Sequence, residues 1–210
     1  KPVLHVDEEG HLVNVAKARG RKASIDALAK SVGKEKLATM QEVCDALVER
    51  LEYFHAHGCK ASDHGLDYVP FVNCTLEEAD AAYQKALRGE KLTVEEVEGY
   101  QTVILLTLGK VYHRLGIAMQ LHYSCLRNNN QRIFKLQGGD TGVDAIAQNT
   151  CGGNISQLLS ALDEAGACPK TILYSLNPID NAQLGSLIGC FQDSSIPGKI
   201  QHGSAWWFND

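Results

Sequence analysis

Single short strand segments alternate with helical segments along the second half of this chain, and that order restricts the fold more than any other feature. Each candidate strand comes directly after a helix or an amphipathic stretch. The four candidates are Cys59–Asp63, Ile117–Ser124, Lys170–Leu176 and Lys199–Ser204. Strands joined through helices pair in parallel, because each crossover returns the chain to the same end of the sheet. The pattern therefore predicts an α/β fold.

Three capping boxes mark the starts of helices. Thr39, Thr75 and Thr93 each stand three residues before a glutamate, so that hydroxyl and carboxylate can satisfy each other's backbone amides. Helices are expected over about residues 40–57, 76–87, 94–115 and 181–191. Apolar residues wrap most of the circumference of the third helix, which we therefore expect to be buried.

Four strands are too few for a closed eight-stranded barrel, which usually needs about 250 residues. The strand count leaves two alternatives: a small open α/β sheet with a helical insertion, or about half of a barrel. For the domain organisation, the patterns predict a mainly helical segment over residues 1–58. The partial (β/α) part then follows over residues 59–210, with a helical insertion at about 68–98.

Composition excludes several classes of function. The 20 Lys and Arg residues against 25 Asp and Glu give a net charge of −5, which disfavours broad nucleic-acid binding. The longest apolar run, Thr102–Leu108, is far shorter than the roughly 20 residues that span a bilayer. Seven cysteines without a CxxC pair indicate reduced thiols. We therefore expect a cytoplasmic protein that binds neither nucleic acid nor membrane.

Polar side chains are most concentrated where the second candidate strand ends. His122 is followed within a few residues by Arg127 and by three asparagines, Asn128–Asn130. An arginine offers a planar fork for a carboxylate, and asparagine offers donors and acceptors for hydroxyl groups. This segment predicts either a substrate-binding loop or a solvated loop in which asparagine tolerates unusual backbone angles.

Two weaker candidates lie at the ends of other strands. Asp63 and His64 stand together after the first strand, where they could transfer a proton, bind hydroxyl groups or simply form a turn. Trp206 and Trp207 follow the last strand. Their rings could form the wall of a sugar-sized pocket or fill a core.

Five longer motifs occur in the order expected for a known family. They are CKASDHGL (59–66), QLHYSCLRNNN (120–130), GGDTGVD (138–144), KTILYSLNPIDN (170–181) and GKIQHGSAWWFND (198–210). With these motifs the chain closely resembles the uronate (glucuronate) isomerase family of the amidohydrolase superfamily. The resemblance covers almost the whole chain and is weakest before Thr39 and over residues 68–98.

The resemblance implies part of a distorted (β/α)8 barrel, with the four strands as about the fourth to seventh. The implied reaction interconverts D-glucuronate with D-fructuronate and D-galacturonate with D-tagaturonate, moving a proton between C2 and C1 through an enediol. The implied catalytic residues are His122 and Asp63, and Arg127 is expected to bind the carboxylate of the hexuronate. Further substrate-binding residues are expected at His64, Asn128 and Trp206.

Most of the metal ligands that the resemblance implies have no counterpart in these 210 residues. A zinc or other divalent ion is therefore expected only for a longer protein, where His122 is a candidate ligand and the main ligands lie outside this chain. The chain is expected to be an internal fragment that is inactive alone. Because a half barrel exposes two sheet edges, we expect it to form homo-oligomers, keep partner fragments or aggregate.

Two other functions stay open at this point. The first is a metal-dependent hydrolase of the same superfamily, for which Lys60 is the only bridging lysine candidate, although it stands at the wrong end of its strand. The second is a non-catalytic α/β module that binds a sugar acid through Arg127 and its neighbouring asparagines.

Overall fold

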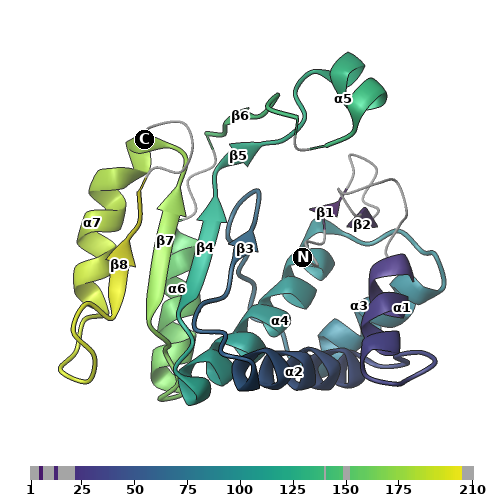
Figure 1. The fold of residues 1–210 in the computed structure, drawn as a ribbon, viewed down its shortest axis with the longest axis horizontal. Helices are drawn as coiled ribbons and strands as arrows, with labels where there is room; N and C mark the ends of the chain where they lie inside the picture. The colour runs from purple at the N-terminus through teal and green to yellow at the C-terminus, as the bar shows by residue number, and fades with distance from the viewer. Residues whose placement is uncertain (1–4, 7–11, 14–21, 140, 149–151, 205–210) are drawn as a thin grey trace. The chain divides into compact units, whose positions relative to one another are not determined.

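The computed structural model describes residues 5–6, 12–13, 22–139, 141–148 and 152–204 (Figure 1). The chain divides into two compact units. The helical unit comprises Lys1–Cys59 and Pro70–Val111, and the sheet unit comprises Lys60–Val69 and Tyr112–Asp210. The predicted insertion at about 68–98 thus lies mainly within the second segment of the helical unit.

The helical unit is built from α-helices packed on a main apolar cluster, beside a smaller one formed by Ala82, Leu92 and Val97. Its elements are β1 (His5–Val6), β2 (Leu12–Val13), α1 (Lys22–Ser31), α2 (Met40–Ala56), α3 (Leu76–Leu87) and most of α4 (Val94–Leu115). The main cluster joins residues of all four helices, and Met40 and Ala79 at its centre have no exposed surface. Tyr83 stacks on Tyr100, with ring centroids 6.3 Å apart, and donates a 2.8 Å hydrogen bond to the Leu37 carbonyl.

The predicted helix starts are confirmed by their caps. At Thr75 the hydroxyl accepts from the Glu78 amide and the Glu78 carboxylate accepts from the Thr75 amide, which completes the capping box. Thr93 makes the same reciprocal pair with Glu96. At Thr39 the hydroxyl accepts from the Glu42 amide. The buried character of α4 is also confirmed, since only Lys110 is exposed between residues 100 and 112.

The sheet unit contains a four-stranded parallel sheet in the order β3-β4-β7-β8 (Figure 1). The strands are β3 (His64–Gly65), β4 (Met119–Tyr123), β7 (Thr171–Ser175) and β8 (Ile200–His202). The α/β prediction is therefore confirmed. The strand predicted over Cys59–Asp63 is too early. Within that range only Ala61 forms an isolated bridge, with Ala118, and regular pairing with β4 begins at His64.

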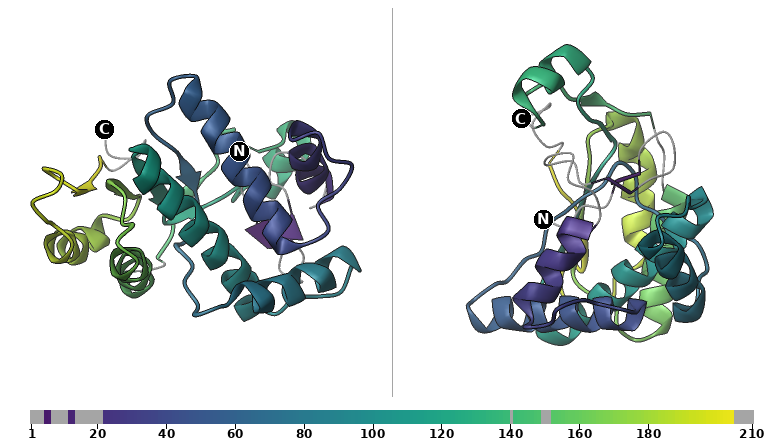
Figure 2. Two further views of the ribbon diagram at one scale, coloured as in Figure 1. Left: turned by 90° about the horizontal axis from the view of Figure 1, so that it is seen from below. Right: turned by 90° about the vertical axis from the view of Figure 1, so that its right-hand side faces the viewer.

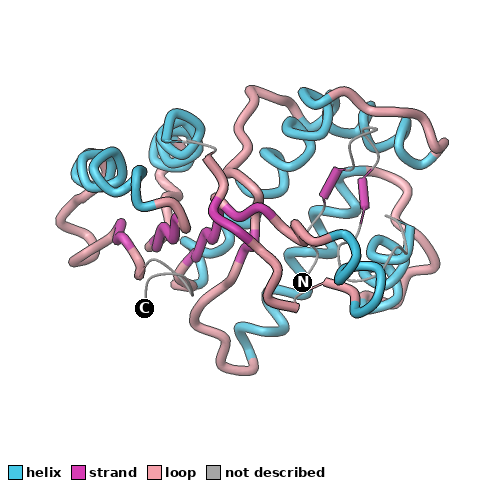
Figure 3. The backbone as a smooth tube through the Cα atoms, turned by 90° about the horizontal axis from the view of Figure 1, so that it is seen from above, coloured by secondary structure: helices cyan, strands magenta, loops and turns pink. Residues whose placement is uncertain are grey.

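The two faces of this sheet differ sharply. Met119, Leu121 and Tyr123 of β4 are buried on one face. The helices α6 (Gly152–Glu164) and α7 (Asn181–Cys190) lie together on one side of the strands (Figure 3). Side chains on the other face of β4 and β7 are only partly buried, as the alternating burial of both strands shows. The less buried face is the one that carries His122.

The alternation of side chains along β4 ends at Ser124. Although Ser124 stands two residues after His122, its backbone takes a left-handed conformation (φ 64°) and its side chain is fully buried. Its hydroxyl and that of Ser175 both donate to Oδ2 of the buried Asp180, at 3.4 and 2.6 Å. This turn ends β4 and redirects the chain into a small hairpin.

The hairpin was not predicted. It consists of β5 (Cys125–Leu126) and β6 (Ala145–Ile146), which pair antiparallel, with α5 (Gln131–Gln137) in the connection between them. In Figure 1, and in the right-hand view of Figure 2, this hairpin and α5 extend beyond the ends of the sheet strands. A short 3-10 turn, η1 (Pro178–Asp180), leads from β7 into α7.

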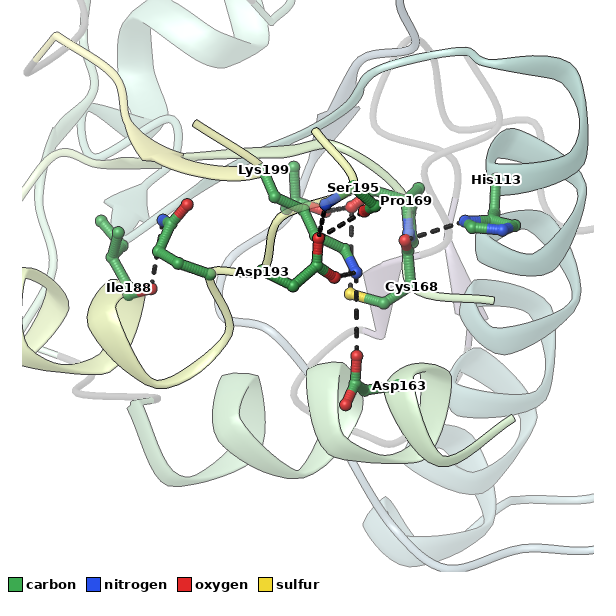
Figure 4. Close-up of polar contacts among 10 residues, drawn as sticks. His113, Asp163, Cys168, Pro169, Ile188, Asp193, Ser195 and Lys199 are labelled. Carbon is green, nitrogen blue, oxygen red and sulfur yellow. Dashed lines mark hydrogen bonds and ion pairs between the residues drawn. The ribbon is translucent and has the colours of Figure 1, made fainter. Parts of the chain in front are cut away.

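A buried lysine lies at the opposite, amino-terminal end of the strands (Figure 4). The side chain of Lys199, immediately before β8, is only 6% exposed and is paired with Asp193 and, at 3.8 Å, with Asp163. The His113 ring nitrogen Nδ1 lies 3.0 Å from the Cys168 carbonyl in the same region. These contacts tie the loop before β8 to the end of α6.

Among the described residues, no helix is long and apolar enough to cross a membrane.

Candidate active site

The carboxyl ends of β3, β4, β7 and β8 lie at one edge of the sheet, because all four strands run in the same direction. Asp63 directly precedes β3, His122 is the penultimate residue of β4, and Tyr174 is the penultimate residue of β7. Arg127 follows β5, just beyond the end of β4. In α/β folds this edge is where binding and catalytic groups gather.

The structure brings together Asp63 and His122, the two residues that the resemblance implies as catalytic. Oδ1 of Asp63 lies 2.7 Å from Nδ1 of His122. Two bare acceptors would repel at that distance, so Nδ1 carries the proton and Nε2 is left as the basic nitrogen. The side chains are 16% exposed for His122 and 38% for Asp63, so a small polar substrate can reach both.

Tyr174 and Gln120 belong to the same site, although the sequence analysis did not select them. The Tyr174 ring stacks on the His122 ring with centroids 4.3 Å apart and planes 9° from parallel. Its hydroxyl donates to Oε1 of Gln120 at 2.9 Å, and Nε2 of Gln120 donates to the Ser62 carbonyl at 3.1 Å. The signal that could have found Gln120 was its alternation with His122 on β4.

Arg127 is held by an acidic residue that was also missed. Its Nη1 lies 2.8 Å from Oδ2 of Asp144, and Oδ1 of Asp144 accepts a 2.7 Å hydrogen bond from the Asn128 amide. Nη2 of Arg127 lies 3.9 Å from where a Cβ on Gly65 would stand, and Gly65 is the register partner of His122. The guanidinium therefore lies beside the carboxyl ends of β3 and β4.

The three asparagines differ in what they contact. Asn129 donates from its side chain to the carbonyls of Leu126 and Val143, and Asn130 caps α5 by accepting from the Ile133 amide. Asn128 is 9% exposed and has a left-handed backbone (φ 54°). Two of the three therefore serve the loop itself, while a substrate contact of Asn128 stays a prediction.

His64 points away from the pair formed by Asp63 and His122. It is the register partner of Leu121, whose side chain is fully buried on the helix-covered face of the sheet. Its Nε2 lies 3.0 Å from the Tyr112 hydroxyl of α4, and burial lowers the pKa of its imidazole to about 4. The geometry does not support the predicted contact of His64 with substrate and gives it a structural place instead.

Trp206, the remaining candidate, lies outside the described residues. The GGDTGVD motif is described except for Asp140, and it contributes Asp144 to the contact with Arg127.

In the described part of the chain, no group of three or more His, Cys, Asp or Glu side chains is arranged to hold a metal ion. His122 offers one imidazole nitrogen, which does not make a metal site by itself.

Comparison with known proteins agrees with the motifs. A family model described as glucuronate isomerase matches residues 11–210. The chain belongs to the glucuronate isomerase family. This confirms the resemblance that the motifs indicated, including that of the segments around His122 and Asp63.

Members of the glucuronate isomerase family from several bacteria are similar to the chain in sequence. The uronate isomerases of Caldicellulosiruptor saccharolyticus and Clostridium acetobutylicum are 49% and 45% identical to it over 186 residues, which is 89% of this chain and 40% of each relative. The chain thus spans about 40% of the length of these relatives.

Two solved structures share the fold. The uronate isomerase of Thermotoga maritima superposes with a TM-score of 0.80 at 30% identity, over 94% of this chain and 42% of that one. The glucuronate isomerase of Caulobacter crescentus gives 0.79 at 22% identity, over 93% and 39%. The predicted partial (β/α)8 barrel of this isomerase family is therefore confirmed.

Proposed function

We propose that the chain supplies the proton-transferring and carboxylate-binding part of a uronate isomerase active site. The substrates would be hexuronates, with D-glucuronate converted to D-fructuronate and D-galacturonate to D-tagaturonate. The observation that carries the proposal is the Asp63–His122 pair, which lies at the same sheet edge as the guanidinium of Arg127. The names of the relatives support the same activity.

Aldose–ketose isomerisation needs a base that removes the C2 proton and returns it to C1. Nε2 of His122 takes that role, and the carboxylate of Asp63 stabilises the imidazolium that forms when the proton arrives. When the C2 proton leaves, the O1 oxygen gains a proton and the enediol forms. When the enediol collapses, the C2 hydroxyl loses its proton to become the ketone and C1 receives the proton held by His122. No net oxidation occurs, so the side chains only move protons and hold the sugar.

Arg127 fixes the other end of the substrate. A planar guanidinium binds a carboxylate through two parallel hydrogen bonds, which a lysine cannot reproduce. Nη1 contacts Asp144, and Nη2 lies 3.9 Å from the Cβ position of Gly65, the register partner of His122. We propose that Asn128 and Trp206 add further substrate contacts.

We propose that the zinc or other divalent metal implied by the resemblance is held by residues outside the described part of the chain. Nε2 of His122 cannot bind a metal and accept a proton at the same time. The described residues alone therefore do not fit a resident metal, and no step above passes through one.

We also propose homo-oligomerisation through the outer strands β3 and β8, which light scattering would test.

The decisive experiment measures uronate turnover in D2O with the protein as its natural gene encodes it. The expected result is ketose formation with solvent deuterium entering at the exchanged carbon, abolished by His122→Gln and retained by His57→Gln in the helical unit. Uronate binding without turnover would instead favour a sugar-acid-binding module. Release of an amine or acid from amide or ester substrates would favour a hydrolase.

A further inference from the structure

The orientation of a histidine ring is set by two torsions, and the second of them is broad and nearly two-fold. The contact between Asp63 and Nδ1 of His122 fixes one atom of the ring and selects between its two flips. A contact at one edge still allows the ring to tilt about that edge. Aiming Nε2 therefore needs a second restraint, one that acts on the flat face of the imidazole.

Tyr174 supplies a restraint of this kind. It is the direct register partner of His122 on the neighbouring strand, and the two side chains leave the same face of the sheet. Their rings are stacked at 4.3 Å and lie within 9° of parallel. A planar neighbour at that distance resists tilting of the imidazole in a way that a flexible aliphatic side chain cannot.

The Tyr174 ring is itself fixed at its far end. Its hydroxyl donates to Gln120, two residues before His122 on the same face of β4, and Gln120 donates in turn to the Ser62 carbonyl. Ser62 directly precedes Asp63, so this chain of hydrogen bonds returns to the residue beside the carboxylate. The ring, its anchor and both members of the catalytic pair thus share one connected set of contacts.

The end of β8 leaves space for this ring. A Cβ placed on Gly203 would stand 2.1 Å from Cε1 of Tyr174 and 2.3 Å from Cδ1, which no side chain can occupy. The backbone of Gly203 is not in the left-handed region, so glycine is needed there for space and not for its conformational freedom. Its amide donates to the Leu173 carbonyl at 2.9 Å, which holds the two strands in this register.

We propose that Tyr174 is a positioning residue for His122, anchored by Gln120 and given its space by Gly203. Asp63 selects the ring flip and Tyr174 sets the ring plane, so that Nε2 is aimed at one point of the site. The consequence for turnover rests on the proposed function, but the ring geometry does not. The two are therefore measured separately.

The first measurement is the NMR signal of His122 in protein labelled with 13C at histidine. A proton on an imidazole stacked under a phenol ring is shifted by its ring current. Tyr174→Leu and Gly203→Ala should both remove this shift, while Tyr174→Phe should keep most of it. Gly185→Ala in α7, where a Cβ meets nothing within 4 Å, is the matched control.

The second measurement is turnover of D-glucuronate by the same proteins. Because misplacing a reacting group by about 1 Å can lower the rate on the order of 10²-fold, we expect Tyr174→Leu to lower kcat by roughly ten- to a hundredfold with little change in KM. Tyr174→Phe should restore most of kcat, and Gly203→Ala should resemble Tyr174→Leu although Tyr174 is intact.

The outcomes separate the two proposals. If the wild-type protein shows the His122 shift but turns over no uronate, the positioning role stands and the proposed function fails. If Tyr174→Leu leaves the His122 signal in place, or if Tyr174→Phe is as impaired as Tyr174→Leu in kcat, the positioning role is overturned. If Tyr174→Leu does not fold, Gly203→Ala and Tyr174→Phe decide the question by the same criteria.

Discussion

Arg127 and Asp144 are joined across the β5–β6 hairpin, with Nη1 of the guanidinium 2.8 Å from Oδ2 of the carboxylate. The Asp144 side chain is 7% exposed, and its second oxygen accepts from the Asn128 amide. Asp144 therefore joins the arm that carries Arg127 to the opposite arm of the hairpin. A guanidinium held in this way can meet a substrate carboxylate with little further loss of rotamer freedom.

Replacing Asp144 by alanine should weaken substrate binding more than catalysis. The partly buried guanidinium would lose its partner, which we expect to lower the free energy of unfolding by about 2 kcal/mol. KM for D-glucuronate should rise on the order of tenfold, because Arg127 would have to be ordered by the substrate itself. Urea unfolding and steady-state kinetics measure the two effects.

Glu95→Ala on the exposed start of α4 is the control for the Asp144 variant. It should change neither the unfolding free energy nor KM. An unchanged KM in Asp144→Ala, with the expected loss of stability, would show that Arg127 does not bind the carboxylate of the substrate.

Asp63→Asn tests the catalytic pair. The amide keeps the size of the carboxylate but cannot stabilise an imidazolium, and it can turn its NH2 group toward Nδ1 and favour the wrong tautomer of His122. We expect kcat to fall by about 10²-fold or more, with KM nearly unchanged. Asp26→Asn in α1 serves as the control. If both variants have the same kcat, Asp63 has no role in catalysis and only forms part of the turn before β3.

The sequence predicts those structural features that depend on residues close together in the chain. It does not predict features that depend on contacts between residues far apart in the chain. The strands over Ile117–Ser124 and Lys170–Leu176 are predictable because a short segment that directly follows a helix or an amphipathic stretch is a local signal. The β5–β6 hairpin was missed because its two-residue strands lie beside a loop of asparagine and glycine, too short to show a period. The local sequence pattern therefore predicts the strands of the parallel sheet but does not predict the β5–β6 hairpin that follows β4.

The site was only partly predictable for a related reason. Motif resemblance selected Asp63, His122 and Arg127, which the structure does place at one sheet edge. Tyr174 meets His122 only through the register of two strands more than 50 residues apart in sequence, and no periodicity specifies that register. The same limit explains why His64 was wrongly expected to contact substrate. A shift of one residue in register exchanges the two faces of a strand, so the sequence does not specify on which face His64 lies.

His64 should make the stability of the sheet unit depend on pH. Burial lowers the pKa of its imidazole to about 4, against a usual value near 6.5, and the nearby charge of Asp63 opposes that shift only in part. Between these two values the unfolded chain binds a proton that the folded chain does not. The contribution of the neutral His64 to the free energy of unfolding should therefore be fully present above pH 6.5 and be lost as the pH falls toward 4.

The size of that effect is bounded by the shift itself, at about 3 kcal/mol. Urea unfolding at pH 7 and pH 4.5 should show it, and His64→Gln should flatten this part of the profile, because glutamine can keep a hydrogen bond to Tyr112 without titrating. A 15N spectrum in which the His64 imidazole becomes charged near pH 6.5 would contradict the prediction.

Lys199 and its two aspartates should govern stability at the extremes of pH. The hydrogen bond from Lys199, followed by those from Ser195, holds the pKa of Asp193 well below its usual range, and Asp193 in turn raises the pKa of Lys199 (Figure 4). For Asp193 the contribution is present above about pH 4 and is lost as the pH falls through its folded value. For Lys199 it is present below about pH 10.5 and is lost as the pH rises through its own folded value.

Lys199→Met separates this ion-pair cluster from the packing of the lysine stem. The methionine fills a similar volume, so the residual loss reflects the two aspartates left without their cation, of which Asp163 is mostly exposed. Thermal unfolding from pH 3 to pH 11 should show a lower Tm at neutral pH and a shallower decline at both ends. Lys170→Met, at the start of the preceding strand segment, is the matched control, and a profile identical to that of Lys199→Met would refute a special role for the buried lysine.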